Sequence, residues 1–304
     1  MRRKKDKGWF LLFFGLFIII GGWLVSLYWV INSYQEIIRE IRTPVFKESR
    51  IAKSEERIEK KRKEKETVKP LEVVSAEKHV PRVGKTKRIA IILDDAGYSL
   101  SGGALELVEK GWPITVAIFP FLSYSKKTAE VVKEHNGEVM LHLPMEANQP
   151  TKLKGTILVN MKEDEIREDV RSAIKAIPYI SGVNNHMGSK ATADVKTMEA
   201  TLSEVKEKGL YFIDSITTEK SCAAKIARKM GLRTGIRKVF LDNEDNQEYV
   251  AKQFELLLSR ARKDGEAIAI GHITKKSTIE FLKSEIPKLT EKGYELVWVS
   301  EMVE

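Results

Sequence analysis

Short apolar runs alternate with amphipathic stretches of helical period along most of this 304-residue chain, from Arg88 onward. The apolar runs predict β-strands at residues 89–95, 113–120, 137–144, 182–189, 210–217, 232–242, 266–273 and 294–301. The amphipathic stretches predict helices at residues 101–110, 125–135, 163–177, 194–208, 219–230, 245–264 and 275–292. Regular alternation of strand and helix builds a parallel sheet, either open or closed into a barrel. The pattern therefore predicts an α/β domain over residues 88–304.

Polar side chains suited to catalysis stand where several of the predicted strands end. Asp94 and Asp95 end the first strand, and His272 ends a late one. The other candidates at strand ends are His142, Glu146, Asn184, Asn185, His186, Asp214 and Ser215. In an α/β barrel the carboxyl ends of the strands face one common rim, where the chemistry collects. We therefore expect these side chains to form one site.

The residue types at this rim suit a divalent metal ion, which takes carboxylate oxygen and imidazole nitrogen as ligands. Side chains of these types are Asp94 or Asp95, His142, Glu146 and His186. A bound ion lowers the pKa of water and polarises a carbonyl group, while a second carboxylate takes the proton from the water. Two adjacent aspartates allow such a division of labour, and His272 could protonate a leaving group.

Other kinds of active site find less support in the sequence. No glycine-rich phosphate loop follows a predicted strand, and no serine stands in a G-x-S-x-G motif. Metal-dependent hydrolysis of a phosphate ester would use similar ligands, but it usually needs more basic groups than this rim offers. Individually, the strand-end aspartates could be helix caps and the histidines hydrogen-bonded core groups. Their joint placement favours a hydrolytic metal site.

Five short segments occur in an order typical of one family: LDDAG (93–97), LHLPME (141–146), NNHMGS (184–189), IDS (213–215) and IGH (270–272). Together they resemble the divergent polysaccharide deacetylase family, a distant branch of the NodB-homology carbohydrate esterases. The resemblance covers roughly residues 88–304. It implies a distorted (β/α) barrel of about seven strands. It also implies metal-assisted removal of an N- or O-acetyl group from a cell-wall or capsular glycan.

The resemblance also implies roles for the residues at the rim. Asp94 corresponds to the catalytic base, Asp95 to a metal ligand and His272 to the acid. Better-known members carry a second histidine where this chain has Glu146, so either His186 or Glu146 completes the metal site beside His142. Asn185 and Asp214 are further candidates for ligating or supporting the metal. We expect the ion to be zinc.

Two aromatic residues are candidates for the glycan-binding surface, because aromatic faces pack on sugar rings. Tyr98 follows the Asp-Asp pair, and Phe119 ends the second predicted strand, where it is equally suited to the core.

Because this chain has Glu146 where better-known family members carry a histidine, a second interpretation of the whole domain stays open. In it the barrel has lost turnover and serves as a glycan-binding or scaffold protein of the cell envelope.

The N-terminal part of the chain predicts a membrane anchor. Residues 8–31 contain no charged residue, and as a helix they would span about 36 Å, enough for a bilayer core of about 30 Å. A cleaved signal peptide would have a shorter apolar core and a small-residue cleavage site, which this sequence lacks. The basic residues of the stub 1–7 favour a cytoplasmic N-terminus. We therefore expect a single-pass protein of the bacterial cytoplasmic membrane with residues 88–304 outside it.

The formal charge of +9 belongs to the N-terminal part. Residues 1–87 hold 21 basic and 11 acidic groups, whereas residues 88–304 hold 31 and 32. Residues 32–87 predict a charged helical spacer followed by a linker. A nearly neutral domain gives no support for binding nucleic acid. The single cysteine, Cys222, excludes a disulfide framework within the chain.

Overall fold

The computed structural model of this protein describes residues 86–100, 103–149 and 153–304. The predicted stub 1–7, the predicted membrane-spanning segment 8–31 and the predicted spacer up to residue 85 lie outside these ranges. Within the described ranges, none of the helices has the length and apolar character needed to cross a bilayer.

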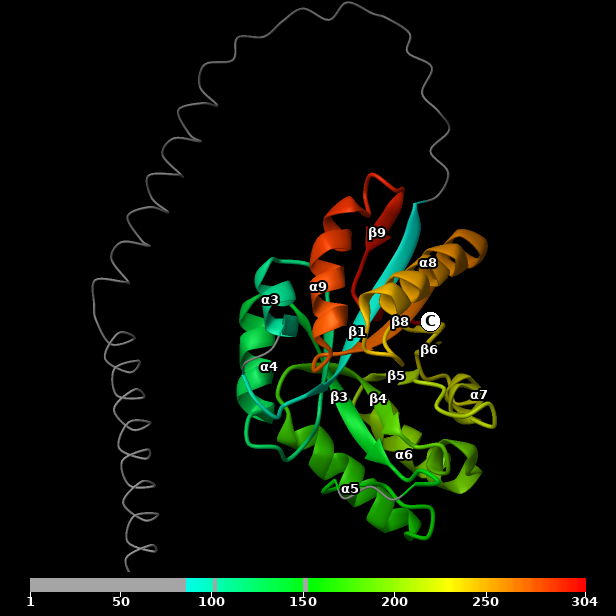
Figure 1. Ribbon diagram of the computed structural model, residues 1–304. Coiled ribbons are helices and arrows are strands. Elements are labelled where there is room, and N and C mark those ends of the chain that lie inside the picture. Colours follow the sequence, from blue (N-terminus) through cyan, green and yellow to red (C-terminus); the bar gives the residue numbers. More distant parts are fainter. Residues whose placement is uncertain (1–85, 101–102, 150–152) are drawn as a thin grey trace, which may run out of the picture. The chain divides into compact units, whose positions relative to one another are not determined.

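A curled sheet of parallel strands forms the centre of the described domain (Figure 1). Its strands are β1 Lys87–Ala96, β2 Thr115–Ile118, β3 Glu138–Met145, β4 Ile180–Met187, β5 Tyr211–Asp214, β6 Thr234–Ile236, β7 Val239–Phe240, β8 Glu266–His272 and β9 Tyr294–Leu296. The strand order is β6-β5-β4-β3-β2-β1-β8-β7, and β9 pairs with the first residues of β1. The predicted α/β class is confirmed, with nine strands among the described residues rather than about seven.

One segment links the two outer edges of the curled sheet. The sequence predicts a single strand over 232–242, but the structure divides it into β6, which pairs with β5, and β7, which pairs with β8. At the crossing, the amide of Arg237 donates to Asp214 O while the amide of Lys238 donates to Ile268 O. Consecutive amides therefore bond to opposite edges, and the sheet curls in the manner of a distorted half-barrel.

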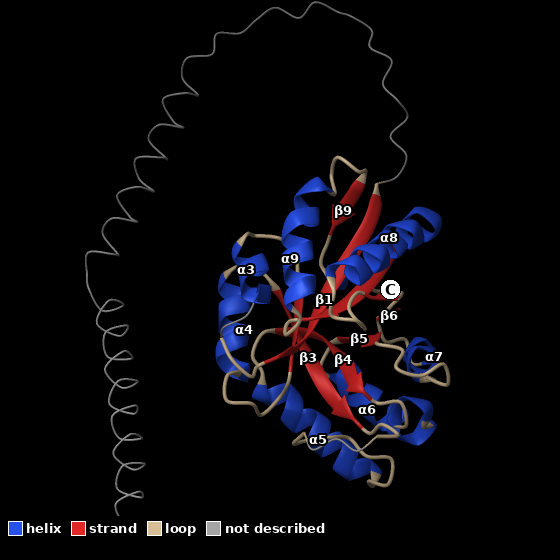
Figure 2. Ribbon diagram, viewed as in Figure 1, coloured by secondary structure: helices blue, strands red, loops and turns tan. Residues whose placement is uncertain are grey.

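Helices cover the outer face of the sheet (Figure 2). They are α3 Gly103–Glu109, α4 Ser125–Glu134, α5 Glu163–Ala176, α6 Val195–Glu207, α7 Ala223–Lys229, α8 Gln247–Asp264 and α9 Lys276–Glu285. Short 3₁₀ turns occupy Ala191–Ala193, Ile286–Lys288 and Val299–Glu301. The last of these shortens the strand predicted at 294–301 to the three residues of β9.

Side chains alternate between the two faces of each strand, as the pleat of a strand requires. On β1, Ile89, Ile91 and Leu93 pack into the main core cluster with residues of the helices, whereas Ala90 and Ile92 join the inner cluster. Other strands supply further members of the inner cluster, including Met140, Tyr211, Ile213, Ile268 and Ile270. Apolar side chains thus fill the inside of the curled sheet along most of the strands, and polar side chains follow at the carboxyl ends of the strands.

Candidate metal and catalytic site

Every second side chain of a strand faces the inner core, and at the carboxyl ends of the strands these inward-facing side chains are polar. Two positions beyond Ile92, Met140 and Ile270 lie Asp94, His142 and His272. Asn184 and His186 stand on β4, where His142 and Asn184 are partners in the β3–β4 register. The same pleat that orders the core therefore directs these side chains to one rim, as the sequence predicts.

Asp95 reaches the rim because β1 is irregular at its end. Regular alternation would turn Asp95 away from Asp94, toward the helices. Its φ angle is instead 68°, and the pairing with β2 shifts register between Leu93 and Ala96. Aspartate tolerates such a left-handed backbone better than most residues with a side chain. The two neighbouring carboxylates consequently face the same site.

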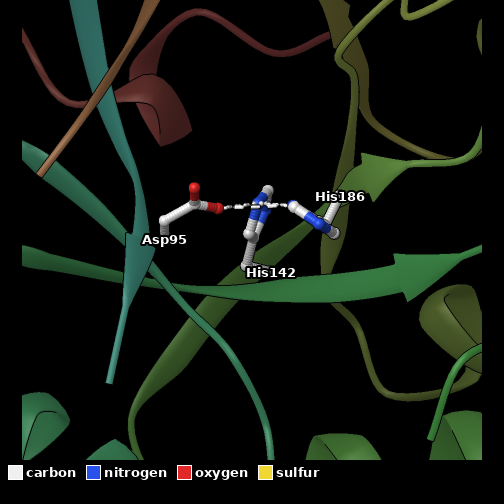
Figure 3. A group of neighbouring side chains, drawn as sticks. All are labelled: Asp95, His142 and His186. Atoms are coloured by element: carbon white, nitrogen blue, oxygen red, sulfur yellow. Dashed lines mark hydrogen bonds and ion pairs between the residues drawn. The ribbon is translucent and has the colours of Figure 1, made fainter. Parts of the chain in front are cut away.

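Three side chains from three strands point toward one another: Asp95 from β1, His142 from β3 and His186 from β4 (Figure 3). His142 Nε2 lies 3.2 Å from Asp95 Oδ1 and 3.1 Å from His186 Nδ1, and the third side of this triangle is 3.3 Å. Ligand atoms about 2.0–2.1 Å from a tetrahedral zinc ion are about 3.3 Å apart. Asp95 Oδ1 is buried without a hydrogen-bond partner among the described residues. Spacing, donor types and this unpartnered oxygen all fit a divalent metal ion.

A chain of hydrogen bonds fixes which nitrogen of His142 faces the triangle. The amide nitrogen of Asn184 donates to Asp94 Oδ1 over 2.9 Å, so its carbonyl oxygen points toward His142. His142 Nδ1 lies 2.7 Å from that oxygen and donates its proton to it. Nε2 therefore keeps its lone pair for the triangle, an arrangement typical of metal-binding histidines. Asn184 was noted among the strand-end residues, but the sequence did not indicate this bridging role.

The two adjacent aspartates differ in their electrostatic surroundings. Burial alone would raise the pKa of Asp95, but the imidazoles of His142 and His186 hold this pKa well below its usual value. Burial raises the pKa of Asp94, against the opposing influence of His142 and Asn184. Asp95 is thus the better anionic ligand, and Asp94 accepts a proton more readily.

His272 lies on β8 beside β1, where its backbone pairs with that of Asp94. Its Nδ1 donates to Asp242 Oδ1 over 2.7 Å, and its amide donates to Asp242 Oδ2. Thr278 also donates to this carboxylate. Burial lowers the pKa of His272, but the bond to Asp242 and its charge outweigh this and raise the pKa to about 8. Asp242 was not predicted as a site residue, although it ends the strand predicted at 232–242.

Comparison with known proteins identifies the family of this chain. The sequence model of the family described as divergent polysaccharide deacetylase matches residues 91–303. This chain belongs to that family. An uncharacterised protein of Haemophilus influenzae is 34% identical over 221 residues, which are 71% of this chain and 78% of that protein. The uncharacterised protein YibQ of Escherichia coli K12 is 35% identical over 61% of this chain and 58% of its own length.

A solved structure shares the fold of this family member. It is the crystal structure of an uncharacterised protein from Agrobacterium tumefaciens C58, with a TM-score of 0.68 and 20% sequence identity. The match covers 72% of this chain and 90% of the Agrobacterium protein. The resemblance stated from the five sequence segments is therefore confirmed at the level of the family.

The two aromatic residues expected to bind the glycan have different surroundings. Phe119 is only 2% exposed, and its ring lies 4.8 Å from that of His142 and 4.7 Å from that of His186, between centroids. Of the two alternatives that the sequence left open for Phe119, its burial against both imidazoles favours the core position. Tyr98 is 55% exposed and packs edge-on against Phe119. It remains a candidate for contacting a sugar.

Glu146 lies outside the triangle of possible metal ligands. Its carboxylate accepts hydrogen bonds from Lys190 Nζ and from the amide of Val159. The charge and hydrogen bond of Lys190 lower the pKa of Glu146. Of the two residues that the sequence left open as the completing ligand, His186 is the one that the structure places beside His142 and Asp95.

Asn185 and Asp214 hold the loops around the site. Asn185 donates to Met187 O and accepts from the amide of Ser215, which joins the ends of β4 and β5. Asp214 accepts from the amide of Ile216, from Ser221 and from the amide of Ala224 in α7. These contacts leave both side chains in supporting positions rather than among the three converging ligand atoms.

Proposed function

We propose that this chain is a metal-dependent deacetylase of a polysaccharide in the bacterial cell envelope. The convergence of Asp95, His142 and His186 on a triangle with sides of 3.1–3.3 Å is the observation that carries the proposal. Membership of the divergent polysaccharide deacetylase family supports the substrate class. The predicted anchor at residues 8–31 supports a place on the outer side of the cytoplasmic membrane.

Asp95, His142 and His186 would hold the ion, for which we propose zinc because its ligand spacing matches the triangle. When bound there, a divalent ion supplies Lewis acidity that activates water and polarises the acyl carbonyl. The chain itself orients the donor atoms. Asn184 fixes the tautomer of His142, and the buried ring of Phe119 packs against both imidazoles.

Asp94 is the proposed base. Asn184 donates a hydrogen bond to Asp94 Oδ1. Asp94 Oδ2 lies 3.7 Å from His142 Nε2 and so faces the proposed metal site. A proton taken from the attacking water would go to Oδ2. His272 is the proposed acid, since Asp242 holds its Nδ1 and leaves Nε2 to deliver a proton to the departing amine or alcohol. Base and acid therefore come from adjacent strands, β1 and β8.

Release of acetate from acetylated envelope glycans tests this function. The full-length protein, loaded with zinc, should release acetate, and Asp94→Asn should abolish the release while keeping the metal. Glu146→Gln is the matched control, because Glu146 is a carboxylate near the rim with partners of its own. No turnover on a broad panel of glycans and metals would favour the alternative of an inactive glycan-binding or scaffold domain.

A further inference from the structure

The imidazole of His272 lies parallel to the ring of Phe240. The two ring centroids are 6.1 Å apart, and the rings are inclined by 14°. Asp242 holds one edge of the imidazole, and Phe240 faces its flat side. Phe240 belongs to β7, which is two residues long and pairs with β8 at two positions only. So short a strand fixes the position of the Phe240 backbone, whereas the orientation of the Phe240 ring depends on the side chains around it.

Arg237 is a neighbour that stacks on this ring, and Phe240 also packs against the inner core cluster. The centre of its guanidinium group lies 3.8 Å from the centroid of Phe240. Its Nε donates to Ser215 O over 2.6 Å, and its Nη2 donates to Ile216 O over 2.8 Å. Two hydrogen bonds from a planar group determine the direction of its plane. Arg237 thereby links the loop after β5 to Phe240 across the β6–β7 crossing.

The contacts of Arg237 suit orientation rather than ion pairing. Its guanidinium is bonded to two carbonyl oxygens and an aromatic face, and no described carboxylate lies within ion-pair distance of it. An arginine kept for its charge alone would be expected to meet a carboxylate directly. Lysine could supply the charge at this position but neither the planar fork nor the flat stacking surface.

We infer that Arg237 is a positioning residue that orients His272 through Phe240. The inference rests on the proposed role of His272 as the acid, but the orientation of the imidazole can be measured without turnover. The charged groups around His272 are Asp242, Asp94 and Asp95, with Arg237 behind the Phe240 ring. If the ring support is lost, the bond between His272 and Asp242 loosens.

NMR titration of His272 in the full-length protein tests this inference, with the resonance assigned through His272→Gln. Arg237→Lys keeps the positive charge, and Phe240→Leu keeps Arg237, so neither changes the local charge. Both should move the pKa of His272 from about 8 toward the ordinary value of about 6.5. Both should lower kcat by roughly 10-fold with little change in KM. The double variant should be no worse than the more impaired single variant, because both residues act along one path.

Arg233→Lys is the matched control, since Arg233 is an arginine of the same segment that lies 5.9 Å over the ring of Tyr211. It should leave the titration of His272 unchanged. An unchanged pKa of His272 in both test variants, with only the melting temperature lowered, would overturn the inference. An equal shift in Arg233→Lys would also overturn it. If the pKa shifts while wild type releases no acetate, the positioning role stands and the proposed function fails.

Discussion

Asn184 joins the proposed base to a proposed metal ligand through its two amide atoms. Its nitrogen donates to Asp94, and its oxygen accepts from His142. Neither an aspartate nor a leucine could do both, because the position needs one donor and one acceptor. The loss of this amide should therefore weaken the orientation of His142 without removing any ligand atom.

We expect Asn184→Ala to lower zinc affinity by about 10–100-fold, as loss of a supporting hydrogen bond to a ligand typically does. Competition with a chelator of known affinity measures the change. Asn185→Ala is the control, because its amide joins Met187 O to the amide of Ser215 instead of contacting a ligand. The control should lower the melting temperature but change zinc affinity little. Equal effects on zinc in the two variants would refute the role of Asn184.

Asp242 should set the alkaline limit of activity through His272. An acid must be protonated, and His272 keeps its proton up to about pH 8 because Asp242 raises its pKa. The rate governed by His272 should therefore fall as the pH rises through about 8. In Asp242→Asn the charge is lost, and this fall should move toward about pH 6.5. The pH dependence of kcat/KM for acetate release measures it, and an unmoved alkaline limb would contradict the assignment.

Residue chemistry at strand ends was enough to predict a ligand set drawn from Asp94 or Asp95, His142, Glu146 and His186, because carboxylate and imidazole are recognisable ligands. The sequence could not single out Asn184 among the polar residues at strand ends, because the role of an amide depends on the hydrogen-bond partners that the fold brings to it. Asp242 was missed because it closes a segment taken as one continuous strand. The sequence left Phe119 open between the core and the glycan-binding surface, because exposure at the rim depends on packing that a single residue type does not reveal.

Among the elements, β1 shows most clearly how a local irregularity creates the site. The positive φ of Asp95 and the register shift before Ala96 place two successive carboxylates on one side of the strand. Alternating hydrophobicity predicts the strand itself but not this break in it. Similarly, the sequence predicts a strand over 232–242, whereas its division into β6 and β7 depends on hydrogen bonds to two distant edges.

Strand β4 passes close to the inner core at Gly182. A Cβ atom there would lie 2.3 Å from the ring of Tyr211, which is itself bonded to the buried Glu138. We expect Gly182→Ala to lower the free energy of unfolding by about 1–3 kcal/mol through overpacking. Urea denaturation of the purified protein measures this loss. Ser181→Ala, at the neighbouring position, should change stability by less than about 0.5 kcal/mol, and a tolerated Gly182→Ala would contradict the packing.

At the scale of the whole molecule, the uneven charge of the chain supports tethering rather than binding of nucleic acid. The basic excess lies in residues 1–87, and the catalytic-looking domain is nearly neutral. The described residues contain no helix capable of crossing a membrane. The predicted anchor, residues 8–31, lies outside the described ranges.

The full-length protein should remain with the membrane fraction after alkaline carbonate extraction, because about 24 apolar residues suffice to span a bilayer. A variant lacking residues 8–31 should instead appear in the soluble fraction. Protease accessibility of a C-terminal tag in spheroplasts measures the side on which the domain lies. Recovery of the full-length protein in the soluble fraction would contradict the anchor.

Zinc titration of the metal-free, full-length protein tests the central proposal most directly. Wild type and Glu146→Gln should each bind one ion with similar affinity, because Glu146 lies outside the ligand triangle. His142→Ala and His186→Ala should each lose stoichiometric binding while remaining folded. Unchanged zinc binding in both histidine variants, or its loss in Glu146→Gln alone, would contradict the metal site.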